Sequence, residues 1–127
     1  LAALASGGIL DAAMARSTFA PLLRDPLRAV RVEAARAMIP LLPSLADAER
    51  AGWFAAAGEL EESQRANADA PASGVGLAAV ALAKGDATLA ESELRRALRL
   101  EAAHVPARVN LADLLRGRGR DAEGEAL

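Results

Sequence analysis

The residues of this chain that could take part in chemistry are few, and their spacing matches no catalytic or metal-binding pattern. The one histidine, His104, lies in the connection 101–106, with no second histidine and no cysteine to share a metal ion. Ser73 precedes Gly74 but lacks the G-x-S-x-G pattern of a hydrolase nucleophile, and no glycine-rich phosphate loop follows a predicted strand. The sequence therefore predicts no enzyme, and no catalytic, metal-ligating or cofactor-binding residue in this segment.

Closely spaced carboxylates occur twice, at Glu61 with Glu62 and at Glu91 with Glu93. Paired carboxyl groups can serve as a general acid and a general base. Glu91, however, also lies four residues before Arg95 on one predicted helix, a spacing that favours an ion pair on the helix surface. We interpret these carboxylates as parts of a solvated helix face.

The composition indicates an all-α chain without thiol chemistry. Ala fills 34 and Leu 20 of the 127 positions, and both are strong helix formers, whereas Tyr and Cys are absent. The lack of cysteine excludes disulfides, cysteine-ligated zinc, iron–sulfur clusters and covalently attached haem from this segment. A net charge of −2 provides no basic field for nucleic acid, and no apolar run reaches the roughly 18 residues that span a bilayer. We expect neither nucleic-acid binding nor membrane insertion.

Glycine, proline and capping residues divide the chain into a series of expected helices. These helices are expected at residues 9–24, 26–39, 45–67, 72–84, 86–100, 105–116 and 121–127. Pro21 should bend or shorten the first, and Asp25 should cap the second with Pro26 at its first position. Ser44, followed three residues later by Asp47, resembles a capping box for the third and longest helix.

A repeat with a period of 34 residues relates the last two helical hairpins. The offset aligns four pairs of identical residues: Val75 with Val109, Leu77 with Leu111, Ala78 with Ala112, and Gly85 with Gly119. The period, and the small, large and small residues at Ala90, Leu94 and Ala97, resemble tetratricopeptide repeats. Departures from the family pattern include Gly74 and Arg108 in place of its aromatic residue. The resemblance covers residues 71–127, as one full repeat and a truncated second one.

Residues 22–35 resemble the turn between the helices of a HEAT-type repeat, with Asp25 and Arg31 as the matching residues. In that family, such an Asp and Arg stabilise the stacking of neighbouring repeats. The alternative is a generic helical hairpin in which Asp25 only caps a helix and Arg31 is a solvated cation.

We therefore expect three segments that together form an all-α, right-handed solenoid of helical hairpins. Residues 1–43 would be a HEAT-like hairpin truncated at its N-terminus, residues 44–70 a long linking helix, and residues 71–127 the tetratricopeptide repeats. This order, in a chain with 14 Arg and one Lys, is similar to the C-terminal region of bacterial multihaem c-type cytochromes. That resemblance implies haem-binding motifs upstream and a periplasmic location, whereas without it the location is open, with the cytoplasm the default.

The predicted site is a groove along the inner wall of the stacked hairpins, which the first helix of each repeat would form. Its candidate residues are Val75, Ala79, Leu82, Val109, Asn110, Asp113 and Arg116. Asn110 could pair with the backbone of a partner, while Asp113 and Arg116 could set its charge preference. Val75 and Ala79 stand where a clamp for a C-terminal carboxylate would need Lys and Asn, so we do not expect such a clamp.

We expect a protein-interaction or scaffold role with a protein or peptide partner. The alternative is a purely structural segment that packs against and orders an upstream enzymatic or haem domain. In that case Trp53 and Phe54 of the long helix would dock against the groove and fill it.

Overall fold

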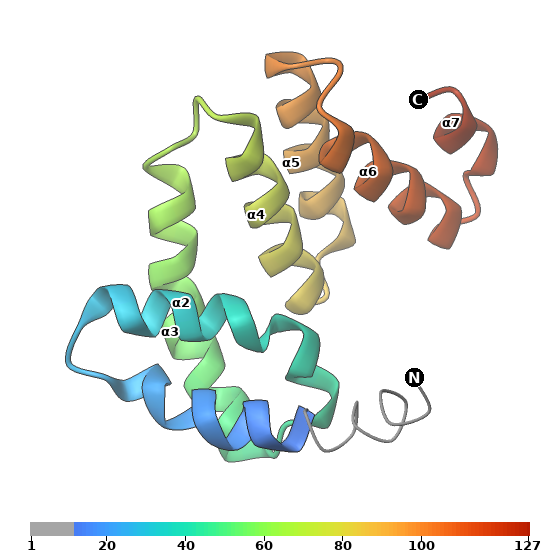
Figure 1. The fold of residues 1–127 in the computed structure, drawn as a ribbon. Helices are drawn as coiled ribbons and strands as arrows, with labels where there is room; N and C mark the ends of the chain where they lie inside the picture. The colour runs from blue at the N-terminus through green and yellow to red at the C-terminus, as the bar shows by residue number, and fades with distance from the viewer. Residues whose placement is uncertain (1–11) are drawn as a thin grey trace, which may run out of the picture. The chain divides into compact units, whose positions relative to one another are not determined.

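The computed structural model describes residues 12–127, and within that range it contains helices and no strands (Figure 1). Residues 12–19 are α-helical. The elements that follow are η1 (Ala20–Arg24), α2 (Arg28–Met38), η2 (Ile39–Ser44), α3 (Asp47–Arg65), α4 (Pro71–Ala83), α5 (Ala87–Leu100), α6 (Val105–Gly117) and α7 (Asp121–Glu125). The expected all-α class is confirmed. The chain forms two units, the first ending at Leu60 and the second running from Glu61 to Leu127.

In the first unit, α-helices give way to 3₁₀ helices at the prolines. The α-helix of residues 12–19 gives way to the 3₁₀ helix η1, which has Pro21 in its first turn, so the proline shortens the α-helix as expected. Pro40 and Pro43 likewise lie in the 3₁₀ helix η2 that follows α2. The first expected helix begins at residue 9, which lies outside the described residues. The expected truncation of the first hairpin also lies outside them.

The start of α2 differs from the prediction by two residues. Leu27 is extended, with φ −86° and ψ 122°, and precedes the first helical residue, so Pro26 is not in the helix. The carboxylate of Asp25 accepts a hydrogen bond from the Leu27 amide at 2.8 Å. Asp25 therefore stabilises the turn before the helix, because its short side chain reaches an amide only two residues further on.

The capping box predicted for α3 is wrong in its residues. Ser44 donates its hydroxyl to the carbonyl of Leu41 at 2.8 Å and lies in the preceding 3₁₀ helix, so it cannot pair with Asp47 as a cap. Instead, Glu49 accepts a hydrogen bond from the Ala46 amide at 3.1 Å. The cap is thus made by a longer side chain in the first turn, which reaches back to a free amide.

The core of the first unit is centred on Trp53 of α3. Its side chain is fully buried, and its indole N–H donates to the carbonyl of Ala35 on α2 at 2.9 Å. Met38 and Leu60 are buried with it. Phe54 meets the Trp53 ring edge-on at a centroid distance of 5.2 Å but remains 45% exposed.

Arg31 joins the turn before α2 to α3. Its Nε and Nη2 atoms each lie 2.7 Å from a carboxylate oxygen of Glu59, and its Nη1 donates to the carbonyls of Asp25 and Pro26. The hydrogen bonds from Arg31 hold the pKa of the Glu59 carboxyl below its usual range. Arg31 is therefore not the solvated cation of the generic alternative, since it binds Glu59, which lies 28 residues further along the sequence.

The 34-residue period of the sequence is also present in the helices of the second unit. The first and last residues of α6 come 34 positions after those of α4, and α7 begins 34 positions after α5. The two equivalent glycines, Gly85 and Gly119, follow α4 and α6 with φ of 83° and 72°. The only positive φ angles among the described residues are at these two positions, where glycine avoids the strain that a Cβ would cause.

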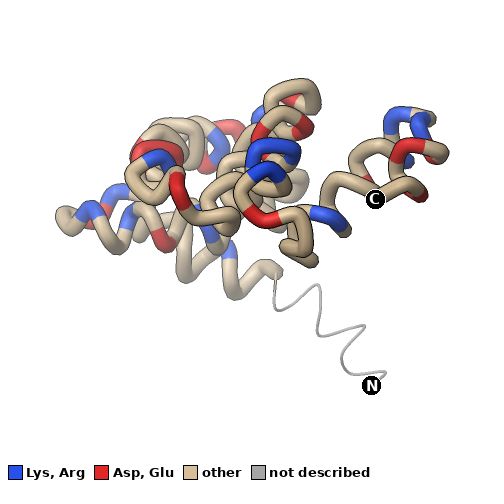
Figure 2. Tube along the Cα trace, turned by 90° about the horizontal axis from the view of Figure 1, so that it is seen from above, with Lys and Arg blue, Asp and Glu red and all other residues tan. Residues whose placement is uncertain are grey.

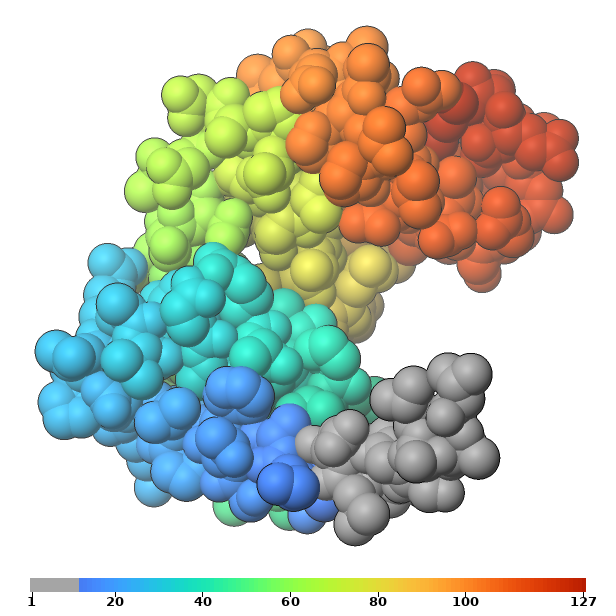
Figure 3. All heavy atoms as spheres, viewed as in Figure 1, coloured from blue at the N-terminus to red at the C-terminus, as the bar shows by residue number. Residues whose placement is uncertain are grey.

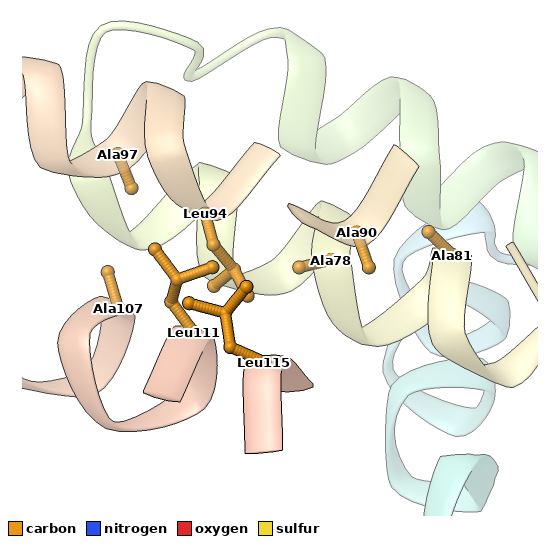
Figure 4. Close-up of a cluster of buried hydrophobic side chains, with 8 residues drawn as sticks. All are labelled: Ala78, Ala81, Ala90, Leu94, Ala97, Ala107, Leu111 and Leu115. Atoms are coloured by element: carbon orange, nitrogen blue, oxygen red, sulfur yellow. The ribbon is translucent and has the colours of Figure 1, made fainter. Parts of the chain in front are cut away.

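A small apolar core holds α4, α5 and α6 together. It consists of eight residues that are at most 3% exposed: Ala78, Ala81, Ala90, Leu94, Ala97, Ala107, Leu111 and Leu115. Figure 4 shows the three leucines pointing toward one another, with the alanines around them. The alanines allow the helix axes to approach closely. Gly74 serves the same purpose, since a Cβ there would lie 2.7 Å from the backbone oxygen of Glu93 on α5.

Glu91 of α5 forms ion pairs with three arginines, two of which follow α6, and we call this cluster the Glu91 hub. One carboxylate oxygen lies 2.9 Å from Arg95, as the four-residue spacing predicts, and the other lies 2.8 Å from both Arg118 and Arg120. The Glu91 side chain is only 14% exposed, so it is more than part of a solvated face. Burial acts to raise the pKa of this carboxyl, but hydrogen bonds from Arg95 and Arg120 outweigh it and hold the pKa below its usual range.

This hub predicts acid sensitivity of the second unit. The folded-state pKa of Glu91 and of Glu123, which hydrogen-bonds Arg120, lies below the ordinary value of 4.5. The stabilisation is therefore complete above pH 4.5 and is lost as the pH falls through the folded-state pKa values. We expect the urea midpoint of Glu91→Gln to depend less on pH below 4.5 than that of the unmodified chain.

The matched control is Glu125→Gln, which alters an exposed carboxylate near the C-terminus. Its midpoint should fall with acid as steeply as that of the unmodified chain. An equally steep fall in Glu91→Gln would contradict the assignment of the acid sensitivity to this hub.

Candidate interaction groove

A groove lies on the second unit where α4 and α6 pack beside each other, with α5 beneath. In Figure 3 the atoms of α6, in orange, lie against those of α4, in yellow. The groove has a volume of about 370 Å³. Its lining residues are Ala78, Ala79, Leu82, Leu94, Asn110, Asp113 and Leu114.

The structure brings four of the seven predicted groove residues together. Ala79 and Leu82 line the α4 side of the groove, and Asn110 and Asp113 line the α6 side. Leu82 is 45% exposed although it is a large apolar residue. At these four positions the α4 side of the groove is apolar and the α6 side is polar.

The other three predicted residues do not line the groove. Val75 is partly buried and packs against the apolar core, while Val109 is 51% exposed outside the groove. Arg116 is exposed and forms an ion pair with the Asp113 carboxylate at 2.9 Å. Asp113 is therefore already neutralised by its own helix, which reduces any charge preference of the groove.

Three lining residues were missing from the sequence-based set: Ala78, Leu94 and Leu114. Ala78 and Leu94 fit the small and large core positions of the repeat, and both are at most 2% exposed. Leu114 is partly buried against the same core. The floor of the groove is thus the edge of the apolar core, which the helical pattern alone could have indicated.

The groove combines an apolar floor with a polar rim. Its floor is apolar, and its polar rim carries one amide and one paired carboxylate. Among the described residues, no hydrogen bond involves the amide of Asn110, which is exposed. This amide offers both a donor and an acceptor to a ligand.

The remaining candidates for chemistry have structural partners. Ser73 is 2% exposed and donates its hydroxyl to the carbonyl of Gln64 at 2.5 Å. His104 precedes α6, with its Nδ1 atom 3.4 Å from a carboxylate oxygen of Glu101. Within residues 12–127 no group of three potential ligands could hold a metal ion.

The neighbouring carboxylates do not form acid–base pairs with one another. Glu61 forms an ion pair with Lys84 of α4, and Glu93 binds Arg96 at 2.8 Å. Glu93 also lies 3.8 Å from Arg65. Each of these carboxylates therefore neutralises a nearby cation, as is typical of helix surfaces.

The aromatic residues that were the alternative occupants of the groove belong to the first unit. Trp53 is fully buried there, with its indole N–H donating to Ala35 on α2. Trp53 therefore packs within its own unit.

Charged residues of both signs are interspersed along the described chain, as Figure 2 shows. None of its helices combines the length and the apolar character needed to cross a membrane.

Comparison with protein-family models, with curated proteins and with solved structures finds no match to this chain.

Proposed function

We propose that the second unit is a non-catalytic protein-interaction module that holds a segment of a partner protein in the groove between α4 and α6. The observation that carries this proposal is the open groove itself, with Leu82 exposed on one side and the unpaired Asn110 amide on the other. An exposed apolar side chain beside a polar group that no other described residue binds is typical of binding surfaces.

The architecture we propose for this function is a tetratricopeptide-like solenoid that follows a HEAT-like hairpin. Support for the first part is the 34-residue period of helix bounds and the matching turns at Gly85 and Gly119. Support for the second is Arg31, which binds the carbonyls of the preceding turn. Successive hairpins of this kind place their first helices along one wall, where α4 and α6 carry the groove.

The partner segment that suits this groove is extended. Backbone groups within a helix are already paired, so only an extended segment or a helix end offers a free N–H and C=O to Asn110. An apolar side chain of the segment would then lie against Ala79 and Leu82. Because Arg116 already neutralises Asp113, the segment needs no particular charge at this point.

The experiment selects phage-displayed random peptides on the full chain and then measures their affinity for an Ala79→Trp variant. Ala79 is partly buried at the groove wall, so an indole there would occupy the groove volume. We expect the selected peptides to lose binding to this variant while the variant keeps its urea midpoint. Leu89→Arg on α5, outside the groove, is the matched control and should bind normally.

A selection that yields no peptide sensitive to Ala79→Trp would refute the groove as a binding site. It would instead favour the structural alternative, in which the segment orders a neighbouring domain.

Asn110→Ala should weaken the binding of such a peptide without changing the stability of the chain. The side chain is exposed and has no hydrogen bond among the described residues, so folding loses nothing. The loss of one hydrogen bond to the peptide backbone corresponds to about 0.5–1.5 kcal/mol, or roughly a 2- to 12-fold rise in Kd. Titration calorimetry with the selected peptide measures this change, and an unaltered Kd would remove Asn110 from the site.

A further inference from the structure

The second unit has a smaller pocket, lined by the end of α3, by α4 and by the start of α5, which we call the α3–α5 pocket. Its volume is about 260 Å³, and it shares no lining residue with the groove. Its apolar lining consists of Leu77 and Ala81, which are buried, and Leu89, which is 39% exposed. Five charged residues complete the lining: Glu61, Arg65, Lys84, Asp86 and Glu93.

Most of the charge in this pocket is neutralised within the protein. Glu61 forms an ion pair with Lys84, and Glu93 accepts a hydrogen bond from Arg96 at 2.8 Å. Arg65 is different, because its guanidinium lies 3.8 Å from Glu93, beyond hydrogen-bond distance, and its side chain is 54% exposed. Arg65 therefore keeps its hydrogen-bond donors for another acceptor.

Asp86 supplies the opposite charge. One of its carboxylate oxygens accepts a hydrogen bond from the Leu89 amide at 2.9 Å, which caps α5. Asp86 has no ion pair among the described residues, so its second oxygen is available to a cation. Arg65 and Asp86 do not pair with each other. One cation and one anion without a hydrogen-bonded counter-ion thus border a single apolar pocket.

We propose that the α3–α5 pocket binds a small zwitterion with an apolar body, namely a free amino acid with an apolar side chain. The carboxylate of the ligand binds the Arg65 guanidinium, and its ammonium group binds the open oxygen of Asp86. The apolar side chain lies against the buried floor of the pocket. A ligand with only one charge would leave either Arg65 or Asp86 without a counter-ion.

The size of the pocket agrees with such a ligand. Its volume is below the roughly 300–1,000 Å³ of sites that hold drug-sized molecules. The site is separate from the groove and is independent of the function proposed for it.

The experiment titrates the full, isotopically labelled chain with L-leucine at neutral pH and follows the amide signals by two-dimensional NMR. We expect saturable shifts at Arg65, Asp86 and Leu89, and none at Asn110 in the groove. Two analogues each lack one charge of leucine: isoamylamine lacks the carboxylate, and isocaproate lacks the ammonium group. Each should bind at least about 5-fold more weakly than leucine.

Two variants test the charges from the side of the protein. Arg65→Gln should weaken leucine at least about 5-fold but leave isoamylamine unchanged, because that ligand has no carboxylate for Arg65. Asp86→Asn should weaken leucine but leave isocaproate unchanged, and asparagine still caps α5. Arg99→Gln, which alters an exposed arginine of α5 outside the pocket, is the matched control and should bind leucine normally.

This crossed pattern of ligands and variants decides the proposal. The absence of saturable shifts up to about 10 mM leucine would overturn it. So would a leucine affinity that neither Arg65→Gln nor Asp86→Asn lowers, or an analogue that binds as tightly as leucine.

Discussion

Trp53→Ala is expected to lower the unfolding free energy of the first unit by about 3–5 kcal/mol, the range for removing a large aromatic side chain from a core. Trp53 is fully buried, and its loss leaves both a cavity and the Ala35 carbonyl without its indole donor. A loss of this size is a large part of the stability of a small domain. Urea unfolding followed by far-UV circular dichroism measures it.

The matched control is the adjacent residue, Phe54→Ala. Phe54 is also aromatic and on the same helix, but it is 45% exposed, so its removal should cost much less than that of Trp53. Equal losses for the two variants would show that the orientation of α3 in the first unit is not the one described. The comparison is independent of helix propensity because both residues are replaced by Ala at neighbouring positions.

Gly74→Val is expected to destabilise the second unit by about 1–3 kcal/mol or more. A Cβ at Gly74 would lie 2.7 Å from the backbone oxygen of Glu93 and 2.9 Å from the Cβ of Ala97. Neither atom belongs to a flexible side chain that could rotate away, so α4 and α5 would have to separate. The expected result is a lower urea midpoint by circular dichroism.

Gly117→Val at the end of α6 is the matched control, because a Cβ there would have no atom within 4 Å. We expect this variant to change the unfolding free energy by no more than about 0.5 kcal/mol. If Gly74→Val were equally mild, the close approach of α4 to α5 at this position would not hold.

Local features of the fold could be predicted well from the sequence. Gly85 and Gly119 mark the turns because a positive φ is a property of a single residue and its neighbours. The proline positions shortened or ended helices for the same reason, since a proline acts on its own turn of the backbone. The 34-residue period predicted equivalent helices, and the structure gives α4 and α6 equivalent bounds.

Helix ends were less predictable where several polar groups compete for the same amides. The sequence predicted a cap of Ser44 and Asp47 for α3, but Ser44 lies in the preceding 3₁₀ helix and Glu49 makes the cap instead. At the start of α2, Asp25 can reach the Leu27 amide only because Leu27 is extended. Such differences are small in energy, so propensity alone does not resolve them.

Long-range pairs were beyond the sequence altogether. Arg31 could be singled out as unusual, but its partner Glu59 is 28 residues away. Glu91 and Arg95 could be paired by their spacing on one helix, whereas Arg118 and Arg120 reach Glu91 only because the second hairpin returns to α5. The sequence indicated only the pair of Glu91 with Arg95, because spacing along one helix does not show contacts with residues beyond it.

Three features follow from the amino acids alone: the chain is helical, two turns need glycine, and two hairpins repeat with a period of 34 residues. These are consequences of backbone preferences and apolar spacing, which act over a few residues. That Asn110 lines the groove while Val109 lies outside it follows instead from how the helices pack. Adjacent residues on a helix differ in direction by about 100°, so the side that each one faces depends on how the helix is rotated in its packing.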